Sequence, residues 1–416
     1  MIQGEFANGL KYAIVRNKSG VGYSALSIKC GTRDEGAYNS GIAHFVEHSI
    51  FKGTKKKSAG KINGYLDKLG GEINAYTTKE EIVIHATVLK EDISKAIDLL
   101  FELSFLPTFP SKEIQTEKGV ILDEINSYKD SPSEEIYDIF EEKLFDGHPL
   151  SKPILGTKKS VKKINSTQLS DFVDEHFLPH NMALSIVVDI DEKIMKRRIE
   201  KLLEKYTPTF VQTDTETLTR ESEKKNEPNF QNLPFEKVIN KKNYQSHCIL
   251  GATAPSLYEE DQRIATVLLC NILGGPASNS ILNSKLREKN GWVYNVECSY
   301  TQYSDTGIVV ICLGCDKENL DKCLTAIHNE LLKLQSTPLS PRRIKAAKKQ
   351  LLGQIAISSD NGESQCLSMG KSLLAYGRVM KDKEIVEKIE KITAEEVMEV
   401  AKTIFEKERI SKIIFV

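Results

Sequence analysis

The two halves of this 416-residue chain show the same order of strand-like and helix-like segments, and this repetition constrains the fold more than any other feature. Shifted by 228 residues, Asn165, a good helix cap, falls on Thr393, another good cap. The same shift pairs apolar residues with apolar residues: Ile164 with Ile392, Leu169 with Val397, Phe177 with Phe405 and Val188 with Val416. Two ordinary amphipathic helices can align by chance, but two copies of one domain is the simplest interpretation.

The spacing of apolar residues predicts the elements of each half, because alternation is typical of strands and a period of three to four is typical of helices. In the first half we expect strands at 10–16, 22–30, 72–78, 82–89 and 182–188. We expect helices there at 40–51, 61–69, 91–104, 111–129, 133–145 and 165–177. In the second half we expect strands at 244–252, 292–300, 306–313 and 411–416 and, besides further long helices, helices at 260–273 and 278–287. This mixture predicts an α+β fold of two homologous domains, each a mostly antiparallel sheet packed with helices.

A polar segment separates the two halves. Residues 213–238 are rich in Thr, Glu, Lys and Asn and contain two prolines, so they cannot bury much apolar surface. We therefore predict a first domain at 1–212, a linker at 213–238 and a second domain at 239–416.

The composition is that of a globular protein, with 40% hydrophobic and 28% charged residues. The net charge is -1, which gives no field to hold a polyanion, so no nucleic-acid partner is expected. The first residues lack the pattern of a secretory signal, and no run of 18 apolar residues occurs. We expect a soluble, cytoplasmic chain with no membrane association, unless a leader has been removed.

Seven of the eight cysteines lie in the second half, several inside apolar runs. This distribution favours buried free thiols over disulfide bonds. Cys312 and Cys315 have the spacing of half a metal site, but no partners complete it, so we expect no metal there.

The segment HFVEH, residues 44–48, is the strongest candidate site. In a helix His44, Glu47 and His48 project from one face, and two imidazoles at this spacing can bind one Zn²⁺. Glu47 can then accept a proton from the attacking water and pass it to a leaving amine. Histidines can share a helix face by coincidence, but three functional residue types at these offsets favour a metal site. The 228-residue shift places Ile272 and Pro276 opposite the histidines, so we expect metal chemistry in the first domain only.

A catalytic zinc commonly has a third protein ligand, and the helix at 111–129 offers Glu117, Asp123 and Glu124. Glu117 and Glu124 lie two turns apart and share a face, whereas Asp123 points about 100° away from Glu124. We predict Glu124 as the third ligand and Glu117 as a residue that orients a ligating histidine. The alternative is that these are ordinary solvated carboxylates.

These residues resemble the signature of the pitrilysin or insulinase family of zinc metallopeptidases, whose motif HxxEH defines the inverzincins. In that family a ligating Glu follows about 75 residues later, with a second Glu seven residues before it; here 75 residues lie between His48 and Glu124. The chain is most similar to short bacterial-type homologues of the mitochondrial processing peptidase. The resemblance implies one Zn²⁺ per chain and a two-domain fold that forms half of a clamshell peptidase.

Residues 70–77, GGEINAYT, are similar to the family's edge strand. An extended peptide can add to an open sheet edge through main-chain hydrogen bonds. The resemblance implies that Asn74 and Ala75 hold the substrate. Taken alone, this segment could also be a plain strand that enters a turn.

Arg287 and Tyr294 match the family's second signature, an Arg and a Tyr seven residues apart in the domain without zinc. The resemblance implies that Arg287 binds a substrate carbonyl and that Tyr294 donates a hydrogen bond to the developing oxyanion. Without the resemblance, they would be an ordinary helix-end cation and an ordinary strand aromatic.

The resemblance therefore implies a zinc metalloendopeptidase that cleaves short or unfolded peptides with Glu47 as general base. Because both signatures occur in one short chain, we expect a homodimer in which the second chain completes each active site. One alternative is a non-catalytic or partner subunit of a complex like the processing peptidase, although such proteins usually lose part of these motifs. A heterodimer with a zinc-less chain is the other.

Overall fold

The computed structural model describes residues 1–206, 233–241 and 244–416. These residues form two compact units, and each unit draws on three stretches of chain. The first unit takes in the described residues of Met1–Asn126, Lys152–Phe230 and Ser358–Met380. The second takes in those of Ser127–Ser151, Gln231–Ile357 and Lys381–Val416.

The first unit is built on a sheet of six strands in the order β1-β2-β6-β3-β5-β4. Only β2 and β6 pair in parallel; the other neighbours are antiparallel. Strand β4 lies at one edge of this sheet. The strands are β1 (Ile2–Glu5), β2 (Lys11–Val15), β3 (Val21–Ile28), β4 (Glu72–Thr77), β5 (Ile82–Leu89) and β6 (Met182–Val187).

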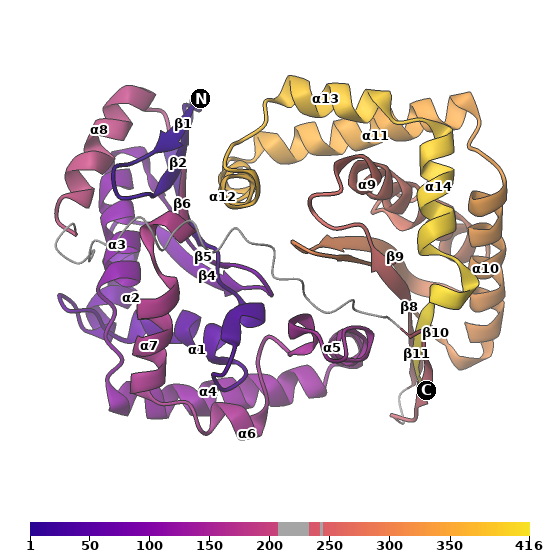
Figure 1. Cartoon of the computed structure of the whole chain (residues 1–416), viewed down its shortest axis with the longest axis horizontal. Helices are drawn as coiled ribbons and strands as arrows, with labels where there is room; N and C mark the ends of the chain where they lie inside the picture. The colour runs from indigo at the N-terminus through magenta and orange to yellow at the C-terminus, as the bar shows by residue number, and fades with distance from the viewer. Residues whose placement is uncertain (207–232, 242–243) are drawn as a thin grey trace. The chain divides into compact units, whose positions relative to one another are not determined.

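Alternating side chains of this sheet face two layers of helix. Leu26 and Ile28 point into the main core, whereas Ala25 faces a smaller apolar cluster on the other side. Most helices of the first half, coloured indigo to magenta in Figure 1, contribute side chains to the main core. These helices are α1 (Ile42–Ser49), α2 (Ala59–Asp67), α3 (Ile93–Phe105), α4 (Ser111–Lys129), α6 (Lys158–Val161), α7 (Ser166–His176) and α8 (Glu192–Leu203).

The second unit has a sheet of five strands in the order β7-β11-β8-β10-β9, again with one parallel pair, β7 and β11. Helices α9, α10 and α14 supply much of its core. The strands are β7 (Glu236–Ile239), β8 (Gln245–Ala254), β9 (Val293–Gln302), β10 (Gly307–Asp316) and β11 (Ser411–Phe415). The helices come in the same order as those of the first half: α9 (Glu260–Gly274), α10 (Leu320–Ser336), α11 (Pro341–Asp360), α13 (Asp382–Lys391) and α14 (Ala394–Ile404).

The two sheets have equivalent topology, which confirms the predicted repetition. Strands β2-β6-β3-β5-β4 of the first sheet correspond in order and direction to β7-β11-β8-β10-β9 of the second. The Asn165 side chain accepts a hydrogen bond from the backbone N of Gln168 at 3.0 Å. Thr393 caps α14 in the same way, accepting from Glu396 N at 3.1 Å.

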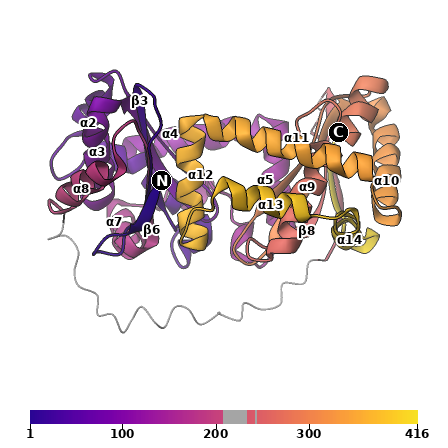
Figure 2. The same cartoon turned by 90° about the horizontal axis from the view of Figure 1, so that it is seen from above.

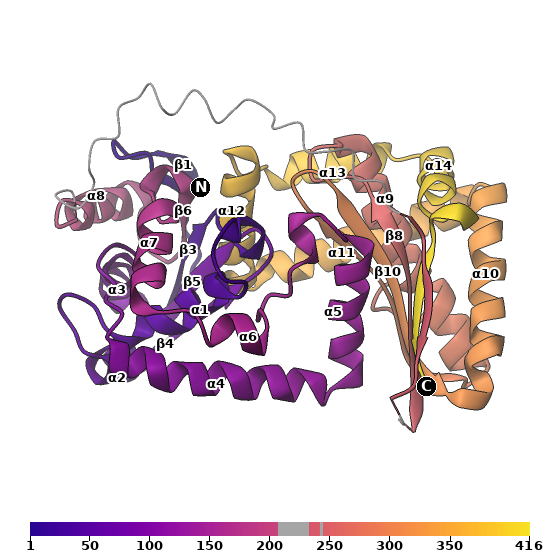
Figure 3. The ribbon, with the colours of Figure 1, turned by 60° about the horizontal axis from the view of Figure 1, so that its bottom comes forward.

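Each unit also contains one helix from the other half of the chain. Helix α5 (Pro132–Leu144) packs on strands β8 and β11 of the second unit (Figure 3). Helix α12 (Gly362–Tyr376) packs on β3 and β6 of the first unit (Figure 2). Shifted by 228 residues, α5 covers 360–372, so the two helices are equivalent. The division of the chain at a single linker did not anticipate this exchange.

The expected elements are present within a few residues, with some differences. The expected helix at 278–287 is largely a π-helical segment, Asn283–Lys289, which runs past the expected end. The sequence does not predict strand β1 or helices α6 and α8. Residues 213–232 of the expected linker lie outside the described residues, and its last residues are not linker but part of β7.

All eight cysteines are buried free thiols, as predicted. Among the described residues, no helix combines the length and the apolar character needed to cross a membrane.

Candidate metal centre and active site

Helix α1 presents two imidazoles on one side. Its apolar residues Ile42, Phe45 and Val46 are buried in the core of the first unit, which fixes the rotation of the helix. His44 and His48 lie one turn apart, with their ring centroids separated by 4.6 Å. His44 is buried and His48 is half-buried.

Glu124 of α4 brings a third group to these imidazoles. Its Oε2 lies 3.7 Å from Nε2 of His44 and 3.5 Å from Nε2 of His48. The candidate ligand atoms of the three residues all lie within 4.8 Å of one another. The structure thus brings together the three residues that the sequence analysis selected as ligands. Asp123, the other candidate on α4, is exposed and is not part of this cluster.

The cluster fits a zinc ion. Two atoms that bind a tetrahedral Zn²⁺ at about 2.0–2.2 Å lie roughly 3.3–3.6 Å apart, close to the spacing between Glu124 and the two histidines. The Oε2 atom of Glu124 is buried and has no hydrogen-bond partner among the described residues. A metal ion would satisfy this atom, because an unpaired buried polar atom is otherwise unfavourable.

Glu117 orients one of the two histidines. It lies in the buried stripe of α4 with Ile114 and Ile121. His48 Nδ1 donates a hydrogen bond of 2.8 Å to Glu117 Oε1, which leaves His48 Nε2 with a free lone pair toward Glu124. The ammonium group of Lys52 lies 2.7 Å from the other oxygen of Glu117. Burial tends to raise the pKa of Glu117, but these two hydrogen bonds lower it overall.

Burial and charge set the protonation of the other groups. Burial lowers the pKa of His44 to about 3, with a smaller contribution from His48, so His44 is a neutral imidazole with an available lone pair. Burial also tends to lower the pKa of His48, but the hydrogen bond to Glu117 and the charges of Glu47 and Glu124 raise it overall. Burial raises the pKa of Glu124. Several carboxylates therefore surround His48, an arrangement that favours a bound cation.

Glu47 is held apart from the metal cluster. Its Oε2 accepts a hydrogen bond of 2.7 Å from Oγ1 of Thr77, the last residue of β4. Burial raises the pKa of Glu47, while Thr77 and His48 oppose this shift. A half-buried carboxylate with a raised pKa, next to two candidate ligands, is suited to accept and release a proton.

A pocket of about 580 Å³ adjoins the cluster. The side chains of Glu47, His48 and Glu117 form one part of its wall. The remainder comes from the chain after α1, from α2 and from the edge strand β4: Phe51, Lys52, Asn63, Asp67, Glu72, Ile73, Asn74 and Ala75. Both residues predicted to hold substrate, Asn74 and Ala75, therefore lie in the wall of a cavity next to the candidate ligands.

Arg287 and Tyr294 belong to the second unit and are not among the residues that the first unit brings together. Arg287 lies in the π-helical segment, and 58% of its side chain is exposed. Tyr294, on the edge strand β9, is also 58% exposed. Its hydroxyl donates a hydrogen bond of 3.1 Å to Asp316 Oδ1, and this contact raises the pKa of Tyr294.

Two residues of the site, Thr77 and Lys52, were missed from the sequence. Thr77 follows Ala75 by two residues, so strand alternation places the two on the same face of β4. Lys52 follows His48 by four residues, which is one helical turn. Both spacings were visible, but only the contacts with Glu47 and Glu117 show what these side chains do.

Comparison with known proteins places this geometry in a family. The family model described as insulinase, peptidase family M16, matches residues 12–158. The model described as the peptidase M16 inactive domain matches residues 163–351. A protein of Rickettsia bellii, named an uncharacterized zinc protease, is 30% identical over 94% of this chain and 91% of its own length. One of Bacillus subtilis with a similar name is 28% identical over 96% of this chain and 94% of its own.

Two solved structures share the fold. A protease from Helicobacter pylori has a TM-score of 0.87 at 18% identity, covering 100% of this chain and 98% of that one. A Pseudomonas fluorescens structure described as a peptidase M16 inactive domain has a TM-score of 0.83 at 18% identity, covering 100% and 97%. Together with the family models and the relatives named zinc proteases, they show that this chain belongs to the insulinase or pitrilysin family of peptidases, peptidase family M16.

Proposed function

We propose that this chain is a zinc-dependent endopeptidase that cleaves short or unfolded peptides. The proposal rests on a difference in position between the two histidines of α1 and the glutamate between them. His44 and His48 converge with Glu124, whereas Glu47, which lies between the histidines in sequence, is outside this cluster and held by Thr77. This leaves one carboxylate for metal binding and another for proton transfer.

Each side chain then has a distinct chemical role. When bound, Zn²⁺ supplies a Lewis acid that polarises the scissile carbonyl and makes a water molecule more acidic. His44, His48 and Glu124 provide its ligands, and Glu117 keeps the lone pair of His48 directed toward the metal. Glu47 accepts the proton of the attacking water and later gives it to the leaving amine. The hydrogen bond from Thr77 holds the carboxylate of Glu47 in one orientation.

The pocket and the edge strand support a peptide as substrate. Among the described strands, β4 pairs with β5 alone, so its other edge can receive an extended chain through main-chain hydrogen bonds. Recognition of this kind requires an extended segment, which an unfolded peptide provides and a folded domain does not. The same wall contains Glu47 and His48, so a chain bound to β4 passes beside the groups that carry out hydrolysis.

We further propose that the active form is a homodimer. In this proposal Arg287 and Tyr294 of one chain complete the site formed by His44, His48 and Glu124 of the other. Their exposed side chains are consistent with a role in binding, and an oriented donor such as Tyr294 contributes on the order of 3 kcal/mol to a transition state.

The proposed activity can be tested with the purified protein and an unstructured fluorogenic peptide. We expect cleavage that a chelator stops and added zinc restores. We expect Glu47→Gln to lower kcat by about 10²-fold or more while zinc content stays at one per chain, because Gln cannot accept the proton. Cleavage that persists in Glu47→Gln, or that is indifferent to the chelator, would count against the proposal. Mass-spectrometric mapping of cuts in a peptide library would then show the preferred residues.

A further inference from the structure

Glu35 is a fully buried carboxylate that the proposed chemistry does not use. It ends the short 3-10 helix Thr32–Glu35. Its Oε1 accepts a hydrogen bond of 2.8 Å from the backbone N of Gly41 and a longer one of 3.4 Å from that of Ala43. Gly41 is the N-cap of α1 and has no side chain to cap it, so Glu35 supplies the acceptor that the first turn lacks.

The first turn of α1 also carries His44. Its Nδ1 is buried and has no hydrogen-bond partner among the described residues. His48 differs, because Glu117 holds its Nδ1 at 2.8 Å. With no partner of this kind, the placement of the His44 ring depends on the backbone that carries it.

That backbone is packed closely where the chain enters α1. Gly41 has a φ of 91°, and a Cβ there would lie 2.7 Å from the carbonyl oxygen of Leu155. Gly156 has a φ of 68°, and a Cβ there would lie 2.3 Å from the carbonyl oxygen of Ser40. The two glycines thus allow two stretches of backbone to touch directly. This contact restrains the entering chain, and Glu35 restrains the turn that follows it.

We propose that Glu35 is a positioning residue: it holds the first turn of α1 and thereby places the imidazole of His44 for metal binding. The inference rests on the metal site of the proposed function. The inference requires residue 35 to present an acceptor oxygen within hydrogen-bonding distance of the backbone N–H groups of Gly41 and Ala43. Gln keeps that oxygen, Asp withdraws it by about 1.5 Å, and Ala removes it.

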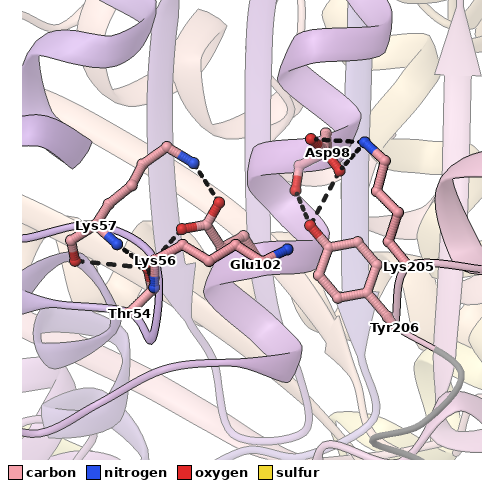
Figure 4. Close-up of polar contacts among 7 residues, drawn as sticks. All are labelled: Thr54, Lys56, Lys57, Asp98, Glu102, Lys205 and Tyr206. Atoms are coloured by element: carbon pink, nitrogen blue, oxygen red, sulfur yellow. Dashed lines mark hydrogen bonds and ion pairs between the residues drawn. The ribbon is translucent and has the colours of Figure 1, made fainter.

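Glu102 offers a matched control. It is also a fully buried glutamate of the first unit, with 1% exposure. It lies on α3 and is hydrogen-bonded to Thr54 Oγ1 at 2.5 Å and to Lys57 Nζ (Figure 4). Both partners lie in the loop beyond α1, so loss of Glu102 should destabilise the fold without moving the first turn of α1.

The experiment measures zinc affinity by competition with a chromophoric chelator, together with the melting temperature of each zinc-free variant. We expect Glu35→Gln to bind zinc within about 3-fold of the wild type. We expect Glu35→Asp and Glu35→Ala to lose about 10-fold or more, the loss typical when a residue that supports a ligand is removed. Glu102→Gln should melt at a lower temperature and keep wild-type zinc affinity.

Wild-type zinc affinity in Glu35→Asp would overturn the inference while leaving the proposed function intact. An equal loss of affinity in Glu102→Gln would also overturn it, because general loosening of the unit would then explain both results. If Glu35→Ala does not fold, the comparison of Gln with Asp decides alone. A wild-type protein that binds no zinc would overturn the proposed function and this inference together.

Discussion

At the scale of single residues, Thr77 controls where the carboxylate of Glu47 points. Its hydroxyl donates a hydrogen bond of 2.7 Å to Glu47 Oε2, and no other hydrogen bond to this carboxylate is seen among the described residues. A general base must be oriented toward the proton that it accepts, so a contact outside the metal ligands can affect turnover. Thr77 joins the strand that lines the pocket to the helix that carries the ligands.

Replacing Thr77 by Val removes this hydroxyl and keeps the shape of the side chain. We expect kcat to fall about 10-fold, which corresponds to roughly 1.4 kcal/mol for one hydrogen bond to a charged group. Zinc content should not change, because Thr77 touches no candidate ligand. Peptide cleavage by Thr77→Val, with Thr77→Ser as control, checks this expectation. Equal turnover in the Val and Ser variants would show that the contact has no catalytic role.

The candidate site could be predicted largely because its residues sit at fixed spacings along single helices. His44, Glu47 and His48 share one face of α1, and Glu117 and Glu124 share one face of α4; the structure brings these two faces together. Glu35 was not found, because its partners are backbone N–H groups of a turn. No pattern of side chains in the sequence records such a contact.

At the scale of elements, α1 is a short helix of eight residues whose start depends on Glu35. Burial raises the pKa of Glu35 to about 7, against the opposing hydrogen bonds from Gly41 and Ala43 and the charges of Lys152 and Lys79. Because its folded pKa lies above the unfolded value, protonation of Glu35 favours the folded state. The stability that this protonation contributes is fully present below about pH 4.5 and is lost as the pH rises through about 7.

We therefore expect the stability of the wild type, relative to Glu35→Gln, to fall as the pH rises from 4.5 to 7.5. The difference between the two free energies of unfolding should change by roughly 3 kcal/mol across this range, because folding raises the pKa of Glu35 from 4.5 to about 7. Urea unfolding of both proteins across this range measures it. A difference that stays constant with pH would mean that Glu35 does not change its charge between the folded and unfolded states.

The two strands that were missed have weak patterns in the sequence. Strands β1 and β7 lie at sheet edges, and their side chains are mostly exposed, so neither strand shows a clear apolar alternation. For this reason the sequence predicts a linker where β7 begins. Central strands such as β3 and β10 are buried and were predicted from their apolar residues.

At the scale of the whole molecule, the metal should contribute to stability as well as to chemistry. Binding to the folded state alone stabilises it by about 4 kcal/mol at a free zinc concentration 1,000 times the dissociation constant. We expect a chelator to lower the melting temperature of the wild type and to leave that of His44→Ala/His48→Ala unchanged. Differential scanning calorimetry with and without chelator measures both. The same shift in the double variant would point to a metal bound elsewhere.

Completion of each site by a second chain can be tested by mixing two inactive variants, Glu47→Gln and Tyr294→Phe. In a mixed homodimer one site receives both lesions and the other receives none. Because half of randomly formed dimers are mixed, we expect recovery of roughly a quarter of wild-type activity. Differently tagged subunits would verify the exchange. An exchanged mixture that stays inactive would argue against completion by the second chain.

The exchange of α5 and α12 between the two units has a consequence for any attempt to divide the protein. A chain cut between residues 207 and 232 leaves an N-terminal fragment whose sheet lacks α12 and a C-terminal fragment whose sheet lacks α5. Each fragment alone would expose apolar sheet surface that a helix normally covers. Produced together, the two fragments could complement each other without a peptide bond between them.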